Sequence, residues 1–184
     1  VRYADDFKVF VRDYKTAYKV YHAIEKYLKI NLGLEISPDK SKITNLRKSK
    51  SEFLGFTLQA KKKRSKHVAI THVSPKKKQE IAERARKLIR EIQKNRNSKA
   101  VNNYNSFVMG VKNYFNGATH VTKDFNEIAY RISRTLYNRL KSVGKYGIPI
   151  KPSETYKLYN KNSYRTYKTF EIVGVHLHPI ACIQ

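Results

Sequence analysis

Residues 1–11 have the sequence VRYADDFKVFV. Apolar and polar residues alternate loosely on both sides of Ala4-Asp5-Asp6, and two short alternating runs that flank a turn predict a β-hairpin. Asp5 and Asp6 would then lie at the tip of a strand pair. Adjacent carboxylates there could hold Mg²⁺, which prefers oxygen ligands and keeps positions open for phosphates. Asp is also common in ordinary turns, so the pair alone does not identify a site.

The sequence after this hairpin predicts one helix and several short strands. Asp13 or Thr16 is a suitable N-cap for the helix, and Gly33 suits the left-handed position after its last turn. We expect a loop of almost pure charge at residues 61–66. The apolar residues of the helix recur at helical spacing: Ala17, Val20, Tyr21, Ile24 and Leu28. The short strands are expected at residues 34–36, at Ile43, at residues 53–58 and at residues 68–72.

Ser74-Pro75 marks a change to helical sequence, because Ser is a good N-cap and Pro fits the first helical position. Three amphipathic stripes with short links follow and predict an antiparallel three-helix bundle. Asp124 and Glu127 have the spacing of a capping box for the third helix, which Gly144 would end. The three stripes are Ile81, Ala85, Leu88, Ile89 and Ile92; Val101, Tyr104, Phe107, Val108, Val111, Tyr114 and Phe115; and Phe125, Ile128, Ala129, Ile132, Leu136 and Leu140.

Residues 145–184 are rich in Tyr, Lys and Asn and have no helical period. We expect a loosely packed basic tail there, with one strand at residues 169–177. The sequence therefore predicts an α+β fold in three parts: residues 1–73, 74–144 and 145–184.

The charge of the chain indicates a polyanionic partner. Lys and Arg number 39 against 14 Asp and Glu, which gives a net charge of +25. No apolar run approaches the roughly 20 residues that a membrane span needs, so we expect a cytoplasmic protein that binds nucleic acid rather than a membrane. Cys182 is the single cysteine, and its grouping with His176 and His178 lacks a fourth zinc ligand. The chain has no initiator Met, and we expect it to be a piece of a longer protein.

Basic residues beside the apolar stripes predict helices that pack on one side and contact phosphate on the other. Few acidic residues are available to balance them. Exposed tyrosine rings such as Tyr156, Tyr159, Tyr164 and Tyr167 could stack on unpaired bases, or they could cover an edge of the core. The candidate nucleic-acid-binding residues are Lys61, Lys62, Lys63, Arg64, Arg84, Lys87, Arg90, Lys94, Lys112, Arg131, Arg134 and Arg139.

Tyr3-Ala4-Asp5-Asp6 resembles the catalytic hairpin of reverse transcriptases. Three further segments follow in the order of that family. The segment LGLEISPDKSKI, residues 32–43, resembles the next palm motif, and Phe53-Leu54-Gly55-Phe56 resembles the primer-grip hairpin. The segment GVKNYF, residues 110–115, is similar to the thumb, or maturase domain, of group II intron-encoded proteins. Over residues 1–143 the chain therefore resembles the C-terminal part of a group II intron reverse transcriptase/maturase.

This resemblance implies a partial antiparallel palm followed by a three-helix thumb, and it assigns roles to particular residues. Asp5 would be a ligand of a two-Mg²⁺ site and Asp6 its less direct neighbour. Tyr3 and Ala4 would lie beside the primer terminus. Lys40 or Lys42 would lie near the phosphates of the incoming nucleotide, as an acid for the leaving pyrophosphate. The residues that position the primer would be Phe53, Leu54 and Gly55, although core packing would explain Phe53 equally well.

The implied activity is RNA-directed DNA polymerisation, together with binding of intron RNA for splicing and retrohoming. The implied partners are group II intron RNA, an RNA template, a DNA primer and dNTP. The family's palm uses a further aspartate on an earlier strand, which these residues do not include, so we expect no polymerisation by this chain alone. Three alternatives stay open. They are an RNA-binding maturase module without catalysis, a retron or CRISPR-associated reverse transcriptase, and a ribosomal or DNA-binding protein, which would leave the hairpin unexplained.

Overall fold

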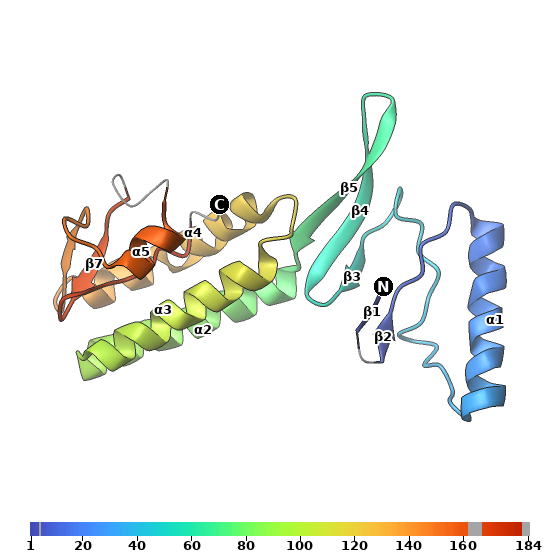
Figure 1. Ribbon diagram of the computed structural model, residues 1–184, viewed down its shortest axis with the longest axis horizontal. Helices are drawn as coiled ribbons and strands as arrows, with labels where there is room; N and C mark the ends of the chain where they lie inside the picture. The colour runs from blue at the N-terminus through green and yellow to red at the C-terminus, as the bar shows by residue number, and fades with distance from the viewer. Residues whose placement is uncertain (4, 162–166, 182–184) are drawn as a thin grey trace. The chain divides into compact units, whose positions relative to one another are not determined.

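The computed structural model describes residues 1–3, 5–161 and 167–181, and within these residues the protein has an α+β fold. The described elements are five helices and three small antiparallel sheets. They form two compact units, Val1–Ser51 and Glu52–Gln184, which we describe separately (Figure 1). No helix in the described part of the chain is long and apolar enough to cross a membrane.

The first unit begins with the predicted hairpin. Strands β1 (Arg2–Tyr3) and β2 (Asp6–Phe7) are antiparallel, with Arg2 opposite Phe7 and Tyr3 opposite Asp6. Helix α1 (Tyr14–Leu32) starts at Asp13, whose carboxylate accepts hydrogen bonds from the backbone and the hydroxyl of Thr16. Gly33 ends the helix in a left-handed conformation. The predicted apolar face of α1 is half-buried, and no residue of the helix is fully buried.

Two predicted strands of this unit are wrong. Residues 34–36 and Ile43 have irregular backbone and belong to none of the three sheets. A strand needs a neighbour to receive its backbone hydrogen bonds, and no described segment pairs with either one. Pro38 and Asp39 lie in a turn, in which the N–H groups of Lys40 and Ser41 both donate to the carbonyl of Ser37.

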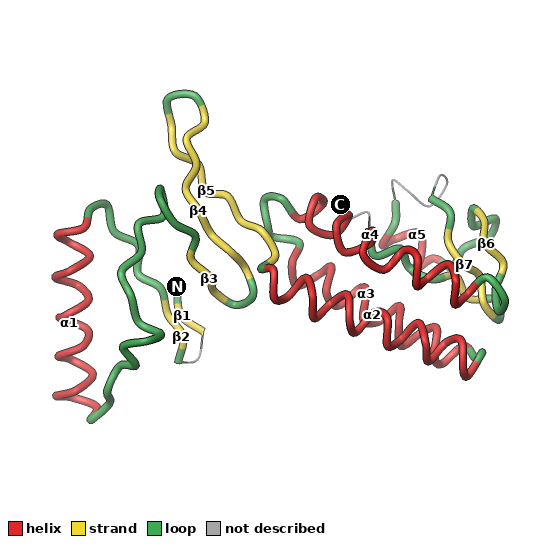
Figure 2. The backbone as a smooth tube through the Cα atoms, turned by 180° about the vertical axis from the view of Figure 1, so that it is seen from behind, coloured by secondary structure: helices red, strands yellow, loops and turns green. Residues whose placement is uncertain are grey.

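The second sheet has the order β3-β4-β5 and consists of β3 (Ser51–Phe53), β4 (Phe56–Lys63) and β5 (Lys66–Val73). The strand expected at residues 53–58 is interrupted by a turn at Leu54-Gly55, where both residues have positive φ. The loop expected at residues 61–66 is instead the outer end of a long hairpin. It is closed by the two-residue turn Arg64-Ser65. We call residues 56–73 the β4–β5 ribbon; it extends beyond β3 (Figure 2).

Three helices follow, as the apolar stripes predict. Ser74 caps α2 (Pro75–Asn95) and Asn97 caps α3 (Ser98–Phe115), and α4 (Val121–Leu140) completes the bundle. Helix α2 packs against both others, as Figure 1 shows. The predicted stripes form the core, with the exception of Tyr114, which is 56% exposed. Gly144 does not end the third helix, which stops at Leu140.

The described residues 145–161 and 167–181 are folded rather than a loose tail. Strand β6 (Lys145–Gly147) pairs with β7 (Thr169–Ile172), which pairs with β8 (Val175–His176). The single strand expected at residues 169–177 is thus a hairpin that turns at Val173-Gly174, where both φ angles are positive. The short helix α5 (Glu154–Tyr159) lies between β6 and β7 in the sequence. Phe170, Ile172 and Leu177 join the core of the three helices, so this segment completes the bundle.

The division between the units falls after Ser51, whereas the sequence predicts a boundary near residue 73. The reason is that the second sheet is fastened to the helices. Val73 is part of the helical core, and the backbone N–H of Ser74 donates to the carbonyl of Gly55. Thr71 and Thr119 exchange hydrogen bonds through backbone and hydroxyl groups. The sheet and the bundle therefore form one body.

Candidate functional site

The hairpin of the first unit exposes the two predicted metal ligands. Asp5 lies in its turn and Asp6 starts β2, and both side chains are exposed, as is Tyr3 opposite Asp6. Ala4 lies outside the described residues. Two adjacent carboxylates fit Mg²⁺, which is usually held by one or two carboxylates with water and phosphate in the remaining positions. The described residues contain no group of three or more His, Cys, Asp and Glu arranged for a metal.

Lys8 is a charged neighbour of this hairpin that the sequence analysis did not single out. Its ammonium donates to the hydroxyl of Ser51 at 2.6 Å. Burial and the positive charge of Lys42 lower the pKa of Lys8, and the carboxylate of Asp6 partly opposes them. Lys42 thus belongs to the charge network beside Asp6, whereas Lys40 lies exposed in the Ser37–Lys40 turn. The sequence signal for Lys8 was its spacing from Asp6, because side chains two residues apart on an extended chain lie on the same face.

The predicted primer-positioning residues form a tight turn fixed to the helices. The carbonyl of Leu54 accepts from the hydroxyl of Tyr114 at 3.0 Å, and Gly55 adopts φ 78°. A Cβ at Gly55 would lie 2.9 Å from the Lys77 side chain, so glycine permits this approach. Phe53 is half-buried, as core packing would also require. These contacts with α3 and α2, all within the second unit, hold the turn in place, as a backbone-positioning element requires.

The predicted nucleic-acid-binding side chains are exposed with one exception. Lys112 is buried at 6% exposure, so we remove it from the candidate surface. Arg131 pairs with Glu127, and Arg139 donates to the amide oxygen of Gln93. The exposed members are Lys61, Lys62, Lys63, Arg64, Arg84, Lys87, Arg90, Lys94, Arg131, Arg134 and Arg139.

Asp124 does not cap α4, and the predicted capping box is wrong. The helix begins three residues earlier, and the Asp124 side chain is 1% exposed. Its carboxylate accepts from the Lys78 ammonium at 2.6 Å, from the Val73 backbone N–H at 2.8 Å and lies 3.0 Å from His72 Nδ1. Burial alone would raise the pKa of Asp124, but the hydrogen bonds from Lys78, His72 and Val73 outweigh it and lower the pKa. Asp124 thereby joins β5, α2 and α4.

A buried polar cluster lies beneath the third sheet. His178 Nδ1 is 3.1 Å from the amide nitrogen of Asn160, and the His178 backbone N–H donates to Asn105 at 2.8 Å. Burial and the nearby charge of Lys112 lower the pKa of His178 to about 4, so its ring is neutral at pH 7. Protein groups enclose the His178 ring, so we assign this cluster a structural role. Cys182 lies outside the described residues.

The exposure of the tyrosine side chains differs from the prediction. Tyr156 is 1% exposed and packs beside His178, so it covers the core rather than stacking on bases. Tyr159 is half-buried, Tyr164 lies outside the described residues, and Tyr167 is partly exposed. Among the described residues of the second unit, Tyr130 is the most exposed tyrosine, at 83%. Tyr130 and Tyr167 line a groove of about 530 Å³ along α4, together with Thr122, Asn126, Ala129, Ser133 and Ala181.

Comparisons with known proteins identify no family for this chain. A scan against protein-family models gives no match, and a search of the curated proteins gives no match either.

Proposed function

We propose that this chain is part of an RNA-directed DNA polymerase of the group II intron type and that it binds intron RNA as a maturase. The observation that carries the proposal is the Tyr3–Asp6 hairpin, whose two adjacent carboxylates are exposed at a turn. The turn at Leu54-Gly55 and the three helices after Ser74 follow it in the order of that family. The net charge of +25 supports a polyanionic partner.

Asp5 and Asp6 are the proposed ligands of Mg²⁺. When bound, two such ions would activate a primer 3′-hydroxyl and stabilise the leaving pyrophosphate. Asp6 and Lys42 both lie close enough to Lys8 to affect its pKa, and the two lysines would attract the phosphates of an incoming nucleotide. Lys40 keeps its proposed role as an alternative acid, because it is exposed in the turn two residues before Lys42.

The second unit is the proposed RNA-binding part. Its exposed cations lie on α2, on α4 and on the β4–β5 ribbon, and few acidic side chains neutralise them. Phosphate contacts of this kind dominate the affinity for nucleic acid and make it depend on salt. Tyr130 and Tyr167, in the groove along α4, add rings on which unpaired bases could stack.

Binding of a labelled group II intron RNA, followed by fluorescence anisotropy, tests the proposal. The variant Arg131→Gln/Arg134→Gln/Arg139→Gln should raise Kd by about 10- to 100-fold near physiological salt. The control Lys15→Gln/Lys19→Gln/Lys26→Gln removes the same charge from exposed positions of α1. Its Kd should change by less than about twofold, because the proposed phosphate contacts all come from the second unit. Absence of RNA binding by the wild-type chain would refute the proposal.

Primer extension tests the catalytic part. With Mg²⁺, an RNA template and a DNA primer, we expect no product from this chain, because the carboxylate that the family supplies from an earlier strand is not among its residues. A two-metal site that lacks one of its ligands is weak. Extension of the primer by the purified chain would contradict this expectation.

The second candidate is an RNA-binding maturase module without catalysis, favoured by the concentration of exposed cations on the second unit. Metal binding separates the two candidates. Mn²⁺ can replace Mg²⁺ at oxygen ligands, and its electron paramagnetic resonance signal reports binding. Loss of that binding in Asp5→Asn/Asp6→Asn would support the polymerase origin, whereas equal binding by wild type and variant would support the module. A retron or CRISPR-associated enzyme would show no preference for intron RNA.

A further inference from the structure

The groove that Tyr130 and Tyr167 line along α4 is a candidate binding site, and we call it the α4 groove. Its volume is about 530 Å³, within the range of roughly 300–1,000 Å³ that is usual for sites of small organic groups. Its two least exposed lining residues are alanines, Ala129 and Ala181. Their small side chains leave room for a planar group between the larger lining residues. No described residue that lines the groove is charged.

The polar side chains of the α4 groove recur at helical spacing. Thr122, Asn126 and Ser133 are four and seven residues apart, and such residues share one face of an α-helix. The Ser133 hydroxyl donates to the carbonyl of Tyr130 at 2.8 Å, which leaves its oxygen as an acceptor. The Asn126 amide, one turn before Tyr130, offers both a donor and an acceptor. These neutral groups match the hydrogen-bonding edge of a nucleobase.

The Tyr130 ring is available for stacking. It is 83% exposed, and it makes no ring contact within the described part of the chain. The exposed Tyr114, in contrast, stacks on Phe56, and Tyr137 packs against Tyr146. Proteins hold unpaired bases by stacking them on aromatic side chains, and the Tyr130 ring can serve in this way without being drawn out of a protein contact.

Two exposed cations flank the Tyr130 ring along the helix. Lys123 precedes it by seven residues and Arg134 follows it by four, so the rise of about 1.5 Å per residue places them roughly 10 Å and 6 Å away along the axis. Neither cation has an ion-pair partner among the described residues. The two acids of α4, Asp124 and Glu127, are both engaged in ion pairs with cations of the bundle. Positive charge therefore remains on both sides of the ring for phosphates.

This arrangement favours a single strand over other occupants of the groove. Bases inside a duplex are stacked on one another, whereas an unpaired base can be splayed out onto an aromatic ring. An apolar peptide would fill the groove but would leave the flanking cations unused. A single-stranded segment uses the ring, the polar lining and both cations, because each of its nucleotides combines a flat base with a charged phosphate.

We propose that the α4 groove holds one unpaired base of a single-stranded RNA segment, stacked on the Tyr130 ring with its edge toward Asn126. Lys123 and Arg134 bind the phosphates on either side of that base. This inference rests on the proposed RNA-binding function and names the form of the RNA that binds at one part of the surface.

The test uses the whole chain and two labelled single-stranded RNA probes of about ten nucleotides, a length in the usual range of such sites. One probe has a single adenine at its centre and abasic ribose elsewhere, and the other is abasic throughout. We expect the wild-type chain to bind the probe with the base about five- to 100-fold more tightly, because stacking contributes this much per base. Tyr130→Leu should remove that preference and should change the affinity for the abasic probe by less than about twofold. Equal affinity of the wild-type chain for the two probes would overturn the inference.

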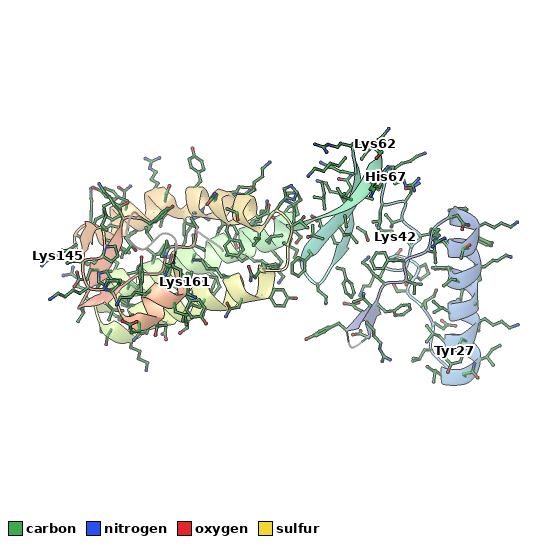
Figure 3. The ribbon with its side chains drawn as sticks, turned by 45° about the horizontal axis from the view of Figure 1, so that its top comes forward. Tyr27, Lys42, Lys62, His67, Lys145 and Lys161 are labelled. Carbon is green, nitrogen blue, oxygen red and sulfur yellow. The ribbon has the colours of Figure 1, made fainter. Side chains whose placement is uncertain are left out.

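Two variants are the controls for the ring. Tyr130→Phe keeps the aromatic face and should keep the preference for the base. Tyr27→Leu removes another exposed tyrosine, on α1 in the first unit (Figure 3), and should bind both probes as the wild type does. Thermal unfolding of Tyr130→Leu should match that of the wild type, because the ring is exposed. An equal loss on both probes in Tyr130→Leu, or a lost preference in Tyr27→Leu, would overturn the assignment.

Two further variants separate the base from the phosphates. Asn126→Ala should weaken only the probe that has the base, by about two- to tenfold, which is the usual effect of one hydrogen bond. Lys123→Gln/Arg134→Gln should weaken both probes by a similar factor, because both have phosphates. The reverse pattern would refute the assigned contacts. The proposed function fails separately, because it requires that the wild-type chain bind intron RNA; binding of intron RNA without a preference for the base would refute only this inference.

Discussion

At the residue scale, Asp124 holds the ribbon, α2 and α4 together. Its carboxylate is buried and meets Lys78, His72 and the Val73 N–H. Removing one partner of a buried ion pair typically costs about 3–5 kcal/mol, and Asn retains part of the hydrogen bonding. We therefore expect Asp124→Asn to lower the free energy of unfolding by about 2–4 kcal/mol, measured by urea denaturation at pH 7.

Glu83→Gln is the matched control, since Glu83 is exposed on α2 and the substitution also removes one negative charge. It should change stability by less than about 0.5 kcal/mol. The lowered pKa of Asp124 means that its stabilisation is present above the unfolded value of about 3.9 and is lost as pH falls through the folded-state pKa. The difference between wild type and Asp124→Asn should accordingly shrink in strong acid; a pH-independent difference would contradict the assignment.

A second prediction at the residue scale concerns the effect of His178 on the pH dependence of stability. Because its pKa is lowered to about 4 in the folded protein, the unfolded chain binds a proton more readily between that value and about 6.5. Stability should be intact above pH 6.5 and should fall as pH drops toward 4, by about 3 kcal/mol at most. Urea denaturation at intervals across this range measures the effect.

The variant His178→Asn is the control for that titration. Asn has an amide oxygen near the position of Nδ1, which can accept from Asn160, but it does not titrate. The variant should be less stable at pH 7 yet lose less stability than the wild type between pH 6.5 and 4. An equal pH dependence in the two proteins would assign the titration to another group.

Side-chain environments at this scale were the least predictable feature. Lys112 and Tyr156 have residue types that usually reach solvent, and the sequence gives no sign that residues 169–181 fold over them. Asp124 has the spacing of a helix cap, but the preceding residues from Val121 already form helix and β5 lies against it. In each case a segment distant in the sequence determines the environment.

At the element scale, the close contact of Gly144 with β7 makes a direct prediction. A Cβ at Gly144 would lie 2.6 Å from Ile172 Cγ1 and 2.8 Å from the carbonyl oxygen of Glu171. Overpacking of this kind costs about 1–3 kcal/mol, so Gly144→Ala should lower the melting temperature. Gly147→Ala is the control, because no atom lies within 4 Å of its added Cβ. Equal melting temperatures for the two variants would contradict the packing of β7 on this position.

The helices were more predictable than the strands. Ser74-Pro75 and the apolar stripes define α2, α3 and α4 from local sequence alone. The β4–β5 ribbon was missed at its outer end, because residues 61–66 carry no apolar alternation and strand pairing there follows from the register set nearer the helices. The same holds for residues 34–36 and Ile43, where strand-forming residues have no partner strand.

At the scale of the whole molecule, the sequence predicted the chemical character of the surfaces better than their shapes. The positions of Asp5 and Asp6 at a hairpin turn, and of cations outside the apolar stripes, follow from local patterns. The folding of the described residues 145–161 and 167–181 onto the bundle does not, because their buried positions are spread over irregular backbone, the short helix α5 and the short strand β7. The attachment of the second sheet to the helices likewise depends on contacts from Thr71 to Thr119 and from His72 to Asp124.

The central claim is that the chain recognises group II intron RNA through phosphate contacts of its second unit. Competition binding at increasing salt tests it most directly, with labelled intron RNA and three unlabelled competitors: the same RNA, an unrelated structured RNA of equal length, and heparin. We predict that log Kd rises with log salt concentration with a slope of about 0.7–0.9 per phosphate contact, and that the intron RNA competes about tenfold or more better than the unrelated RNA. Equal competition by all three polyanions, with no preference at any salt concentration, would contradict the account.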